Sequence, residues 1–271
     1  MPPSFLEQFG PFVNDESLLI PSGYPDLSAI AGMIVDHRAD KGVTYNGSNK
    51  VSVWSDQASS GNHLANGAGA EPTYVPSRAS FGGKPAILFE TTGTHDGMVA
   101  AAASPPLAPL HGGAGTTWFV CFEPGARTDA TLQLFWGTST TAGSQHGCNL
   151  YYVGSTQLLF AFAVRGVGAT FNSGVAAARS TAHWAVVRHA TGQVNNLQMF
   201  VDQIASPDVN VNYTGTPSSS DPSTALTIGR RPGGVDFGFD GHVARISGWN
   251  RLLTDAELGD VQKFAANEWG L

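Results

Sequence analysis

The sequence predicts an all-β protein, a two-sheet antiparallel sandwich that ends in one short helix. From residue 30 onward, short apolar runs alternate with clusters of Gly, Asn, Ser and Asp, which is the pattern of short strands joined by turns. The composition agrees, because only 13% of the residues are charged while the chain contains 33 glycines and 16 prolines. At 271 residues the chain has the length of one large sandwich domain.

The expected strands are the apolar runs that turn residues bound on both sides. They lie at 33–36, 51–54, 86–89, 116–122, 131–136, 149–153, 158–164, 183–189, 197–202, 225–228 and 239–249. The run at 116–122 is apolar on both faces, with Trp118 and Val120 on one face and Phe119 and Cys121 on the other. We therefore expect this strand to be buried on both sides.

The one expected helix lies at the C-terminus. Thr254 and Glu257 have the spacing of a capping box, in which a hydroxyl and a carboxylate bind the exposed amides of the first turn. Leu253 and Leu258 flank it at the positions of a hydrophobic staple. The apolar face of this helix, which we expect to pack on the sandwich, consists of Leu258, Val261, Ala265 and Trp269.

Residues 1–25 differ from the remainder of the chain. Five prolines interrupt this segment and disfavour both a helix interior and a central strand. Its apolar side chains nevertheless favour burial. Two interpretations stay open, a strap that lies across its own domain and an arm that docks on a partner, with the docking residues Phe5, Leu6, Phe9 and Phe12.

Charge and targeting signals exclude several classes of partner. The net charge is −7 and the longest basic run is Arg230–Arg231, so the clustered cations of a nucleic-acid surface are missing. No stretch approaches the roughly 20 apolar residues of a membrane helix. The N-terminus lacks the pattern of a secretory signal. We expect a protein made in a cytoplasm, with Cys121 and Cys148 as free thiols or, if their strands are neighbours, as a pair.

Several segments together are similar to one known family. These segments are VSVWSDQASSGNHL at 51–64, GKPAILF at 83–89, HWAVVR at 183–188, LTIGR at 226–230, FDGHVARI at 239–246 and WNRLLTDAEL at 249–258. They resemble the laminin-G-like domains of the concanavalin A-like lectin and glucanase superfamily. Two positions depart from the family pattern, because Arg245 stands where an acidic residue is usual and Gln203 where a glycine usually follows Asp202.

The resemblance implies a jelly roll for residues 26–271, with one concave sheet and loops at its rim. Members occur as carbohydrate-binding modules, adhesion domains and virion proteins. The fold by itself does not choose among these functions.

The sequence lacks the motifs of the enzymes built on this scaffold. Retaining glycosidases carry two carboxylates on one strand, but Glu-x-Asp-x-x-Glu does not occur and no glutamate has an acidic residue at i+2. The nucleophile elbow Gly-x-Ser-x-Gly is also missing. We therefore expect a protein that does not catalyse a reaction.

Two kinds of binding site are considered. Calcium in rim loops of this fold is held by carboxylate and carbonyl oxygens, and the candidate donors are Asp96, Asp236 and Asp240. We expect no other cofactor, and we interpret Asp36, His37 and Asp40 as a solvated strand end. A glycan needs exposed aromatic rings, and the candidates outside the tryptophan-rich core are Tyr151, Tyr152, Phe171, Tyr213 and Phe237.

These observations lead to one main hypothesis and two alternatives. The main hypothesis is a structural or adhesion protein of a bacteriophage virion, a capsid decoration or tail-associated protein that binds capsid or tail subunits, itself as a homo-oligomer such as a trimer, or surface polysaccharide. The first alternative is a stand-alone carbohydrate-binding module, located outside the cell by a non-classical route. The second is an enzyme that degrades polysaccharides.

Overall fold

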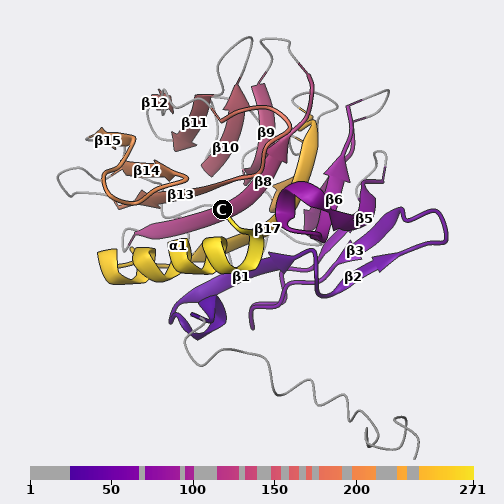
Figure 1. Cartoon of the computed structure of the whole chain (residues 1–271), viewed down its shortest axis with the longest axis horizontal. Helices are drawn as coiled ribbons and strands as arrows, with labels where there is room; N and C mark the ends of the chain where they lie inside the picture. The colour runs from indigo at the N-terminus through magenta and orange to yellow at the C-terminus, as the bar shows by residue number, and fades with distance from the viewer. Residues whose placement is uncertain are drawn as a thin grey trace, which may run out of the picture.

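The structure is a computed structural model of the whole chain. It describes residues 25–66, 71–91, 95–100, 115–127, 132–138, 148–153, 159–164, 169–172, 177–190, 197–211, 225–230 and 238–271. Two antiparallel sheets and a C-terminal helix account for most of them, as the sequence predicts (Figure 1).

Sheet A has eight strands in the described part of the chain. Its order is β15-β14-β13-β8-β17-β6-β5, and β1 pairs with β17 beside β6. The strands are β1 (Met33–Arg38), β5 (Thr73–Arg78), β6 (Lys84–Phe89), β8 (Thr116–Pro124), β13 (His183–His189), β14 (Leu197–Val201), β15 (Val209–Val211) and β17 (Gly241–Trp249). Strands β1 and β6 both pair with β17. The first and last strands of the domain, β1 and β17, are therefore hydrogen-bonded to each other.

Sheet B has nine strands among the described residues, in the order β12-β11-β10-β9-β16-β7-β4-β3-β2. The strands are β2 (Val43–Tyr45), β3 (Val51–Trp54), β4 (Leu64–Asn66), β7 (Met98–Ala100), β9 (Leu132–Gly137), β10 (Cys148–Val153), β11 (Leu159–Val164), β12 (Ala169–Asn172) and β16 (Thr227–Ile228). Two short 3-10 turns, Leu27–Ala29 and Ala79–Phe81, complete the description.

The main core lies between the two sheets and a second core lies on the outer face of sheet A. Strand β8 contributes to both, because Trp118, Val120 and Phe122 are in the first core while Phe119 and Cys121 are in the second. All nine residues of β8 are buried, which confirms the predicted strand with two buried faces. Cys121 is a free, buried thiol, and burial raises its pKa well above the usual value.

Helix α1 (Asp255–Trp269) covers the outer face of sheet A (Figure 1). The predicted capping box is present, and Gly270 ends the helix in the left-handed conformation with φ 74°. The predicted apolar face is buried, and Phe264 belongs to it as well. In the part of the chain that the structure describes, no helix is long and apolar enough to span a bilayer.

The predicted strands are confirmed, with bounds that differ by at most three residues. The strands that the sequence analysis missed are β2, β4, β5, β7, β12 and β15, and most of these contain only three residues. Strand β5 is longer but contains Pro76, which a sheet tolerates because β5 is an edge strand. The arm residues Phe5, Leu6, Phe9 and Phe12 and most of the two predicted loops at 112–115 and 218–223 lie outside the described residues.

Candidate functional site

A buried ion pair joins the first and last strands of the domain. Arg245 of β17 donates from Nε and Nη2 to the two carboxylate oxygens of Asp36 on β1, at 2.7 and 2.9 Å. Ser247 donates to the same carboxylate at 2.8 Å. Asp36 and Arg245 are each 1% exposed, and the guanidinium lies 4.8 Å from the ring centroid of Phe264 on α1. Arg245, which stands where the family usually has an acidic residue, is therefore the ion-pair partner of the buried Asp36.

The loop that follows β3 is organised around Asp56. One carboxylate oxygen of Asp56 accepts the amides of Asp36 and Ala58, at 2.8 and 3.0 Å. The other accepts the Ser60 hydroxyl and the Asn62 amide, at 2.7 and 3.0 Å. The segment 55–63, which is part of the family resemblance, thus forms a closed loop that is hydrogen-bonded to β1. Both carboxylate oxygens of Asp56 accept the hydrogen bonds that hold this loop.

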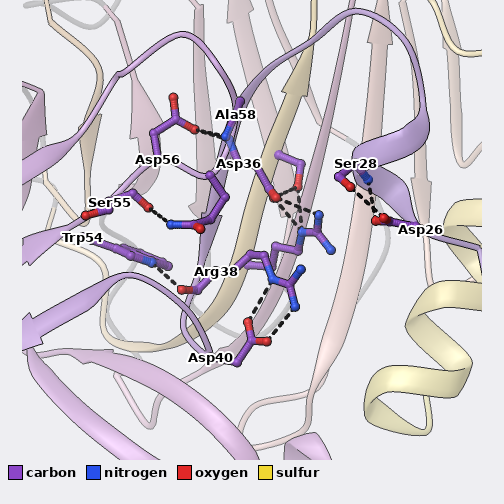
Figure 2. A network of polar contacts seen from close by, with 12 residues as sticks. Asp26, Ser28, Asp36, Arg38, Asp40, Trp54, Ser55, Asp56 and Ala58 are labelled. Atoms are coloured by element: carbon purple, nitrogen blue, oxygen red, sulfur yellow. Dashed lines mark hydrogen bonds and ion pairs between the residues drawn. The ribbon is translucent and has the colours of Figure 1, made fainter. Parts of the chain in front are cut away.

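Figure 2 shows a separate ion pair beside these contacts, in which Arg38 donates to the carboxylate of Asp40. Trp54 donates its indole N–H to the carbonyl of Arg38 at 2.8 Å. His37 is completely buried, and burial lowers its pKa to about 4, so it is neutral at pH 7. The prediction of a solvated strand end is therefore wrong for Asp36 and His37, because β17 and the loop after β3 cover β1.

A small pocket opens beside this network, between α1 and the outer face of sheet A. Arg38, Lys84, Arg245, Phe264 and Glu268 are among its lining residues. Its volume of ≈ 10 Å³ is that of a single water molecule. A pocket of this size does not admit a sugar ring.

The structure contradicts two of the predicted glycan contacts. Tyr151 and Tyr152 are 2% and 0% exposed, because β10 is an interior strand of sheet B. Tyr152 packs in the core between the sheets against Phe135 and Phe239. Neither ring offers a free face to a ligand. The side chain of Phe171 and the whole of Tyr213 and Phe237 lie outside the described residues.

The structure also describes two of the three predicted calcium donors. Asp96 accepts the amide of Glu90 at 2.9 Å, and Asp240 accepts the amide of Arg127 at 3.0 Å. Asp96 thus closes the loop that begins at Glu90, whereas Asp240 joins the start of β17 to the segment that follows β8. Within the described ranges, no three His, Cys, Asp or Glu side chains form a group that could hold a metal ion. Asp236 lies outside these ranges.

A pair of tyrosines forms an aromatic surface that the sequence analysis did not find. Tyr45 is 46% exposed, the one exposed large hydrophobic side chain in the described part of the molecule. Its ring stacks on that of Tyr74, with centroids 4.5 Å apart and planes inclined by 17°. Tyr45 comes from β2, the edge of sheet B, and Tyr74 from β5, the edge of sheet A. We call this pair the tyrosine platform.

The turn between β2 and β3 holds the platform in place. The side-chain oxygen of Asn46 accepts the amides of Ser48 and Lys50, at 2.9 and 3.0 Å. Asn49 adopts a left-handed conformation with φ 59°, and its carbonyl accepts the amide of Tyr74 at 2.7 Å. The turn of one sheet is therefore hydrogen-bonded to the edge strand of the other, which fixes the two rings relative to each other.

Polar groups surround the platform. The Lys50 ammonium donates to the Thr73 hydroxyl at 2.8 Å, on the strand that carries Tyr74. Burial, the neighbouring Tyr45 hydroxyl and the charge of Asp40 together raise the pKa of Tyr74. An exposed ring face with hydroxyl, ammonium and amide groups beside it is the combination that the sequence analysis required for sugar binding. Sequence reasoning missed it because Tyr45 and Tyr74 lie 29 positions apart on different sheets.

The comparisons with known proteins agree on the architecture. No protein-family model and no curated protein sequence matches the chain. Among solved structures, an arabinofuranosidase complexed with arabinofuranosyl-α-1,2-xylobiose aligns with a TM-score of 0.61 over 91% of this chain and 65% of that one, at 12% identity. The chain shares the two-sheet jelly-roll fold of these structures.

Two further structures support this assignment of the fold. Domain 4 of AbnA, a GH43 extracellular arabinanase from Geobacillus stearothermophilus solved in complex with arabinotriose, aligns with a TM-score of 0.55 at 10% identity. The alignment covers 85% of the present chain and 98% of the AbnA domain. A Trypanosoma rangeli sialidase aligns with a TM-score of 0.57 at 16% identity, over 92% of this chain but only 36% of the sialidase.

Proposed function

We propose that the protein is a carbohydrate-binding domain and that the tyrosine platform is its contact surface. The observation that carries the proposal is the exposed ring of Tyr45, held by Tyr74 from the other sheet. An aromatic ring has a negative face, which favours the positively polarised C–H groups of a sugar ring. Because the two rings are stacked before any ligand arrives, binding requires little ordering of side chains.

The fold supports the proposal without deciding it. Two of the similar structures, the arabinofuranosidase and the AbnA domain, were solved with arabinose-containing oligosaccharides. The AbnA domain is a single domain of about the size of this chain, since 98% of it is covered. These ligands are therefore the first to test on this protein.

We also propose that the domain does not catalyse a reaction. Three of the buried carboxylates already have charged or hydrogen-bonding partners. Asp36 is paired with Arg245, Asp56 closes a loop, and Glu123 is held by Arg78 and Ser80. The experiment is the release of reducing sugar from arabinan, arabinoxylan and a panel of other polysaccharides. Turnover that a single carboxylate substitution abolishes would establish an enzyme instead.

The expected binding result concerns Tyr45. Replacement Tyr45→Ala removes the exposed ring and should weaken glycan binding at least tenfold, which corresponds to about 1.4 kcal/mol. Tyr45→Phe should retain most of the affinity because it keeps the ring. Titration calorimetry with arabinotriose and with the best ligand of a glycan array measures both variants.

The matched control is Thr44→Ala, since Thr44 is an exposed neighbour of Tyr45 on the same strand and carries no aromatic ring. Thr44→Ala should melt at the temperature of the parent protein because its side chain is exposed, whereas Tyr45→Ala should melt slightly lower because it loses the stack on Tyr74. Equal affinities of Tyr45→Ala and Thr44→Ala would exclude the platform as the binding surface.

A bacteriophage virion remains our proposed setting, in which the domain binds capsid or tail subunits or a surface glycan. It is supported by the composition of residues 1–25, apolar and interrupted by proline. Glycan binding and incorporation in a virion are compatible, because they would use different parts of the chain.

A further inference from the structure

The turn that joins β2 to β3 is a polar element next to the tyrosine platform. Its residues 46–49 are all exposed, as is Tyr45, which directly precedes them. The Cα atoms of Tyr45 and Asn46 are about 3.8 Å apart, as in any two consecutive residues. A glycan that rests on the ring of Tyr45 can therefore reach this turn.

Hydrogen bonds also connect the turn to the second ring. The Asn46 carbonyl accepts the amide of Asn49 at 2.9 Å, and the Asn49 carbonyl accepts the amide of Tyr74 at 2.7 Å. Tyr74 in turn stacks on Tyr45, the covalent neighbour of Asn46. This closed set of contacts fixes Asn46 relative to both rings of the platform.

The contacts of the Asn46 side chain decide which of its terminal atoms is oxygen. One terminal atom faces the backbone N–H groups of Ser48 and Lys50, at 2.9 and 3.0 Å. An N–H group only donates, so this atom is the carbonyl oxygen Oδ1 and the other atom is the NH2 nitrogen, Nδ2. Because the oxygen is held by two hydrogen bonds, the orientation of the NH2 group is fixed as well.

The NH2 group of Asn46 is available to a ligand. It carries two N–H donors, and it donates to no protein acceptor among the residues that the structure describes. A donor that is held in place before the ligand arrives loses little freedom on binding. The oxygen of a sugar hydroxyl is a suitable acceptor, because it has two lone pairs.

We infer that Asn46 determines which sugars the tyrosine platform selects, because its NH2 group donates a hydrogen bond to one hydroxyl of a glycan stacked on Tyr45. The inference rests on the proposed function. A ring face attracts the C–H groups of most sugars alike, whereas a hydrogen bond requires a hydroxyl at one position. The preferred ligand class is therefore a glycan in which that hydroxyl is present and unsubstituted.

Asn46→Asp tests the donor and keeps the turn. The substitution exchanges the NH2 group for an oxygen of similar size, and the carboxylate can still accept the amides of Ser48 and Lys50. The probe is arabinotriose, or the best neutral ligand of a glycan array, titrated into the full chain by calorimetry. We expect the affinity to fall about fivefold to tenfold, the effect of one hydrogen bond. The melting temperature should stay close to that of the parent protein.

The matched control is Asn49→Asp. It makes the same chemical change in the same turn and adds the same charge, and aspartate adopts the left-handed conformation of Asn49, φ 59°. The hydrogen bond to Tyr74 is made by the main chain, so the substitution leaves it in place. The affinity of this variant should remain within about twofold of the parent value. A loss equal to that of Asn46→Asp would assign the effect to the added charge and overturn the inference.

Monodeoxy analogues of the same ligand identify the hydroxyl. One analogue should bind the parent protein about fivefold to tenfold more weakly than the complete ligand, and this difference should disappear in Asn46→Asp. Equal affinities of all analogues for the parent protein would overturn the inference without any variant.

These outcomes are distinguishable from failure of the proposed function. Binding that Tyr45→Ala weakens but Asn46→Asp leaves within about twofold of the parent value would overturn the inference and leave the platform as the binding surface. Binding of no glycan in a Tyr45-dependent manner would overturn both.

Discussion

Asp36 and Arg245 show that the burial of a charged residue can depend on a partner 209 positions away in the sequence. Each is buried, and the pair is complete only with Ser247 beside it. Removing either partner of such a pair leaves an uncompensated buried charge, which costs about 3–5 kcal/mol. The surface pair of Arg38 and Asp40 is more exposed and contributes roughly 1 kcal/mol or less.

His183 is another residue whose state depends on its neighbours. Its Nδ1 lies 2.5 Å from a carboxylate oxygen of Asp202, and its Nε2 lies 3.0 Å from the carbonyl oxygen of Ala178. Both partners are acceptors, so the ring donates twice and is positively charged. Burial lowers the pKa of His183, but the hydrogen bond and charge of Asp202 outweigh it and raise the pKa above its usual value.

This arrangement predicts a pH-dependent contribution to stability. Because the folded pKa of His183 lies above the unfolded value of 6.5, the contribution is complete below pH 6.5 and disappears as the pH rises through the folded pKa. Asp202→Asn should therefore destabilise the protein at pH 5.5 and have a much smaller effect at pH 9. Urea unfolding at both pH values measures the difference.

The replacement suits this position for a structural reason. Asp202 has a left-handed backbone, φ 55°, which asparagine adopts readily, and an amide oxygen can still accept the Trp184 N–H. The charge is lost, and so is the acceptor that faces His183 Nδ1, because the second carboxylate oxygen becomes an NH2 group. An equal loss of stability at pH 5.5 and 9 would contradict a charged His183.

At the scale of elements, the C-terminal helix is the segment that local sequence determines most completely. Thr254 accepts the amide of Glu257, and the Glu257 carboxylate accepts the amide of Thr254 at 2.8 Å. The hydrogen bond from Arg251 and those from Thr254 lower the pKa of Glu257 to about 2, against the opposing effect of burial. All of these contacts lie within seven consecutive residues.

Thr254→Ala should destabilise the protein by about 1 kcal/mol, because it leaves an amide of the first turn without its acceptor. Thr254→Ser keeps the hydroxyl and should cost much less. Thermal unfolding at pH 7 compares them. A loss for Thr254→Ser as large as that for Thr254→Ala would mean that the methyl group, rather than the cap, is responsible.

The strands show which elements local sequence patterns can predict and which they cannot. Those with four or more apolar residues, such as β8 and β13, were predicted because their burial follows from composition. Strands β2, β4 and β7 have three residues each, and they exist because neighbouring strands supply their hydrogen bonds. Strand β5 is an edge strand with a proline, so its sequence resembles a loop.

At the scale of the whole molecule, assembly is still a prediction. The arm interpretation predicts that deletion of residues 1–25 abolishes a homo-oligomer, such as a trimer, without lowering the melting temperature of the domain. Light scattering measures the mass and calorimetry the melting temperature. A domain that unfolds on deletion would instead favour the strap, and a protein that is already a monomer before deletion would favour the carbohydrate-binding module.

The sequence by itself determined the fold class, the longer strands, the capped helix and the doubly buried β8. These features depend on periodicity and on neighbours within a few residues, which the chain order preserves. Only the tertiary structure decided that Tyr151 and Tyr152 are buried in an interior strand while Tyr45 and Tyr74 meet at the edges of two sheets. Exposure depends on which strands lie beside a residue, and strand order joins segments that are far apart in the sequence.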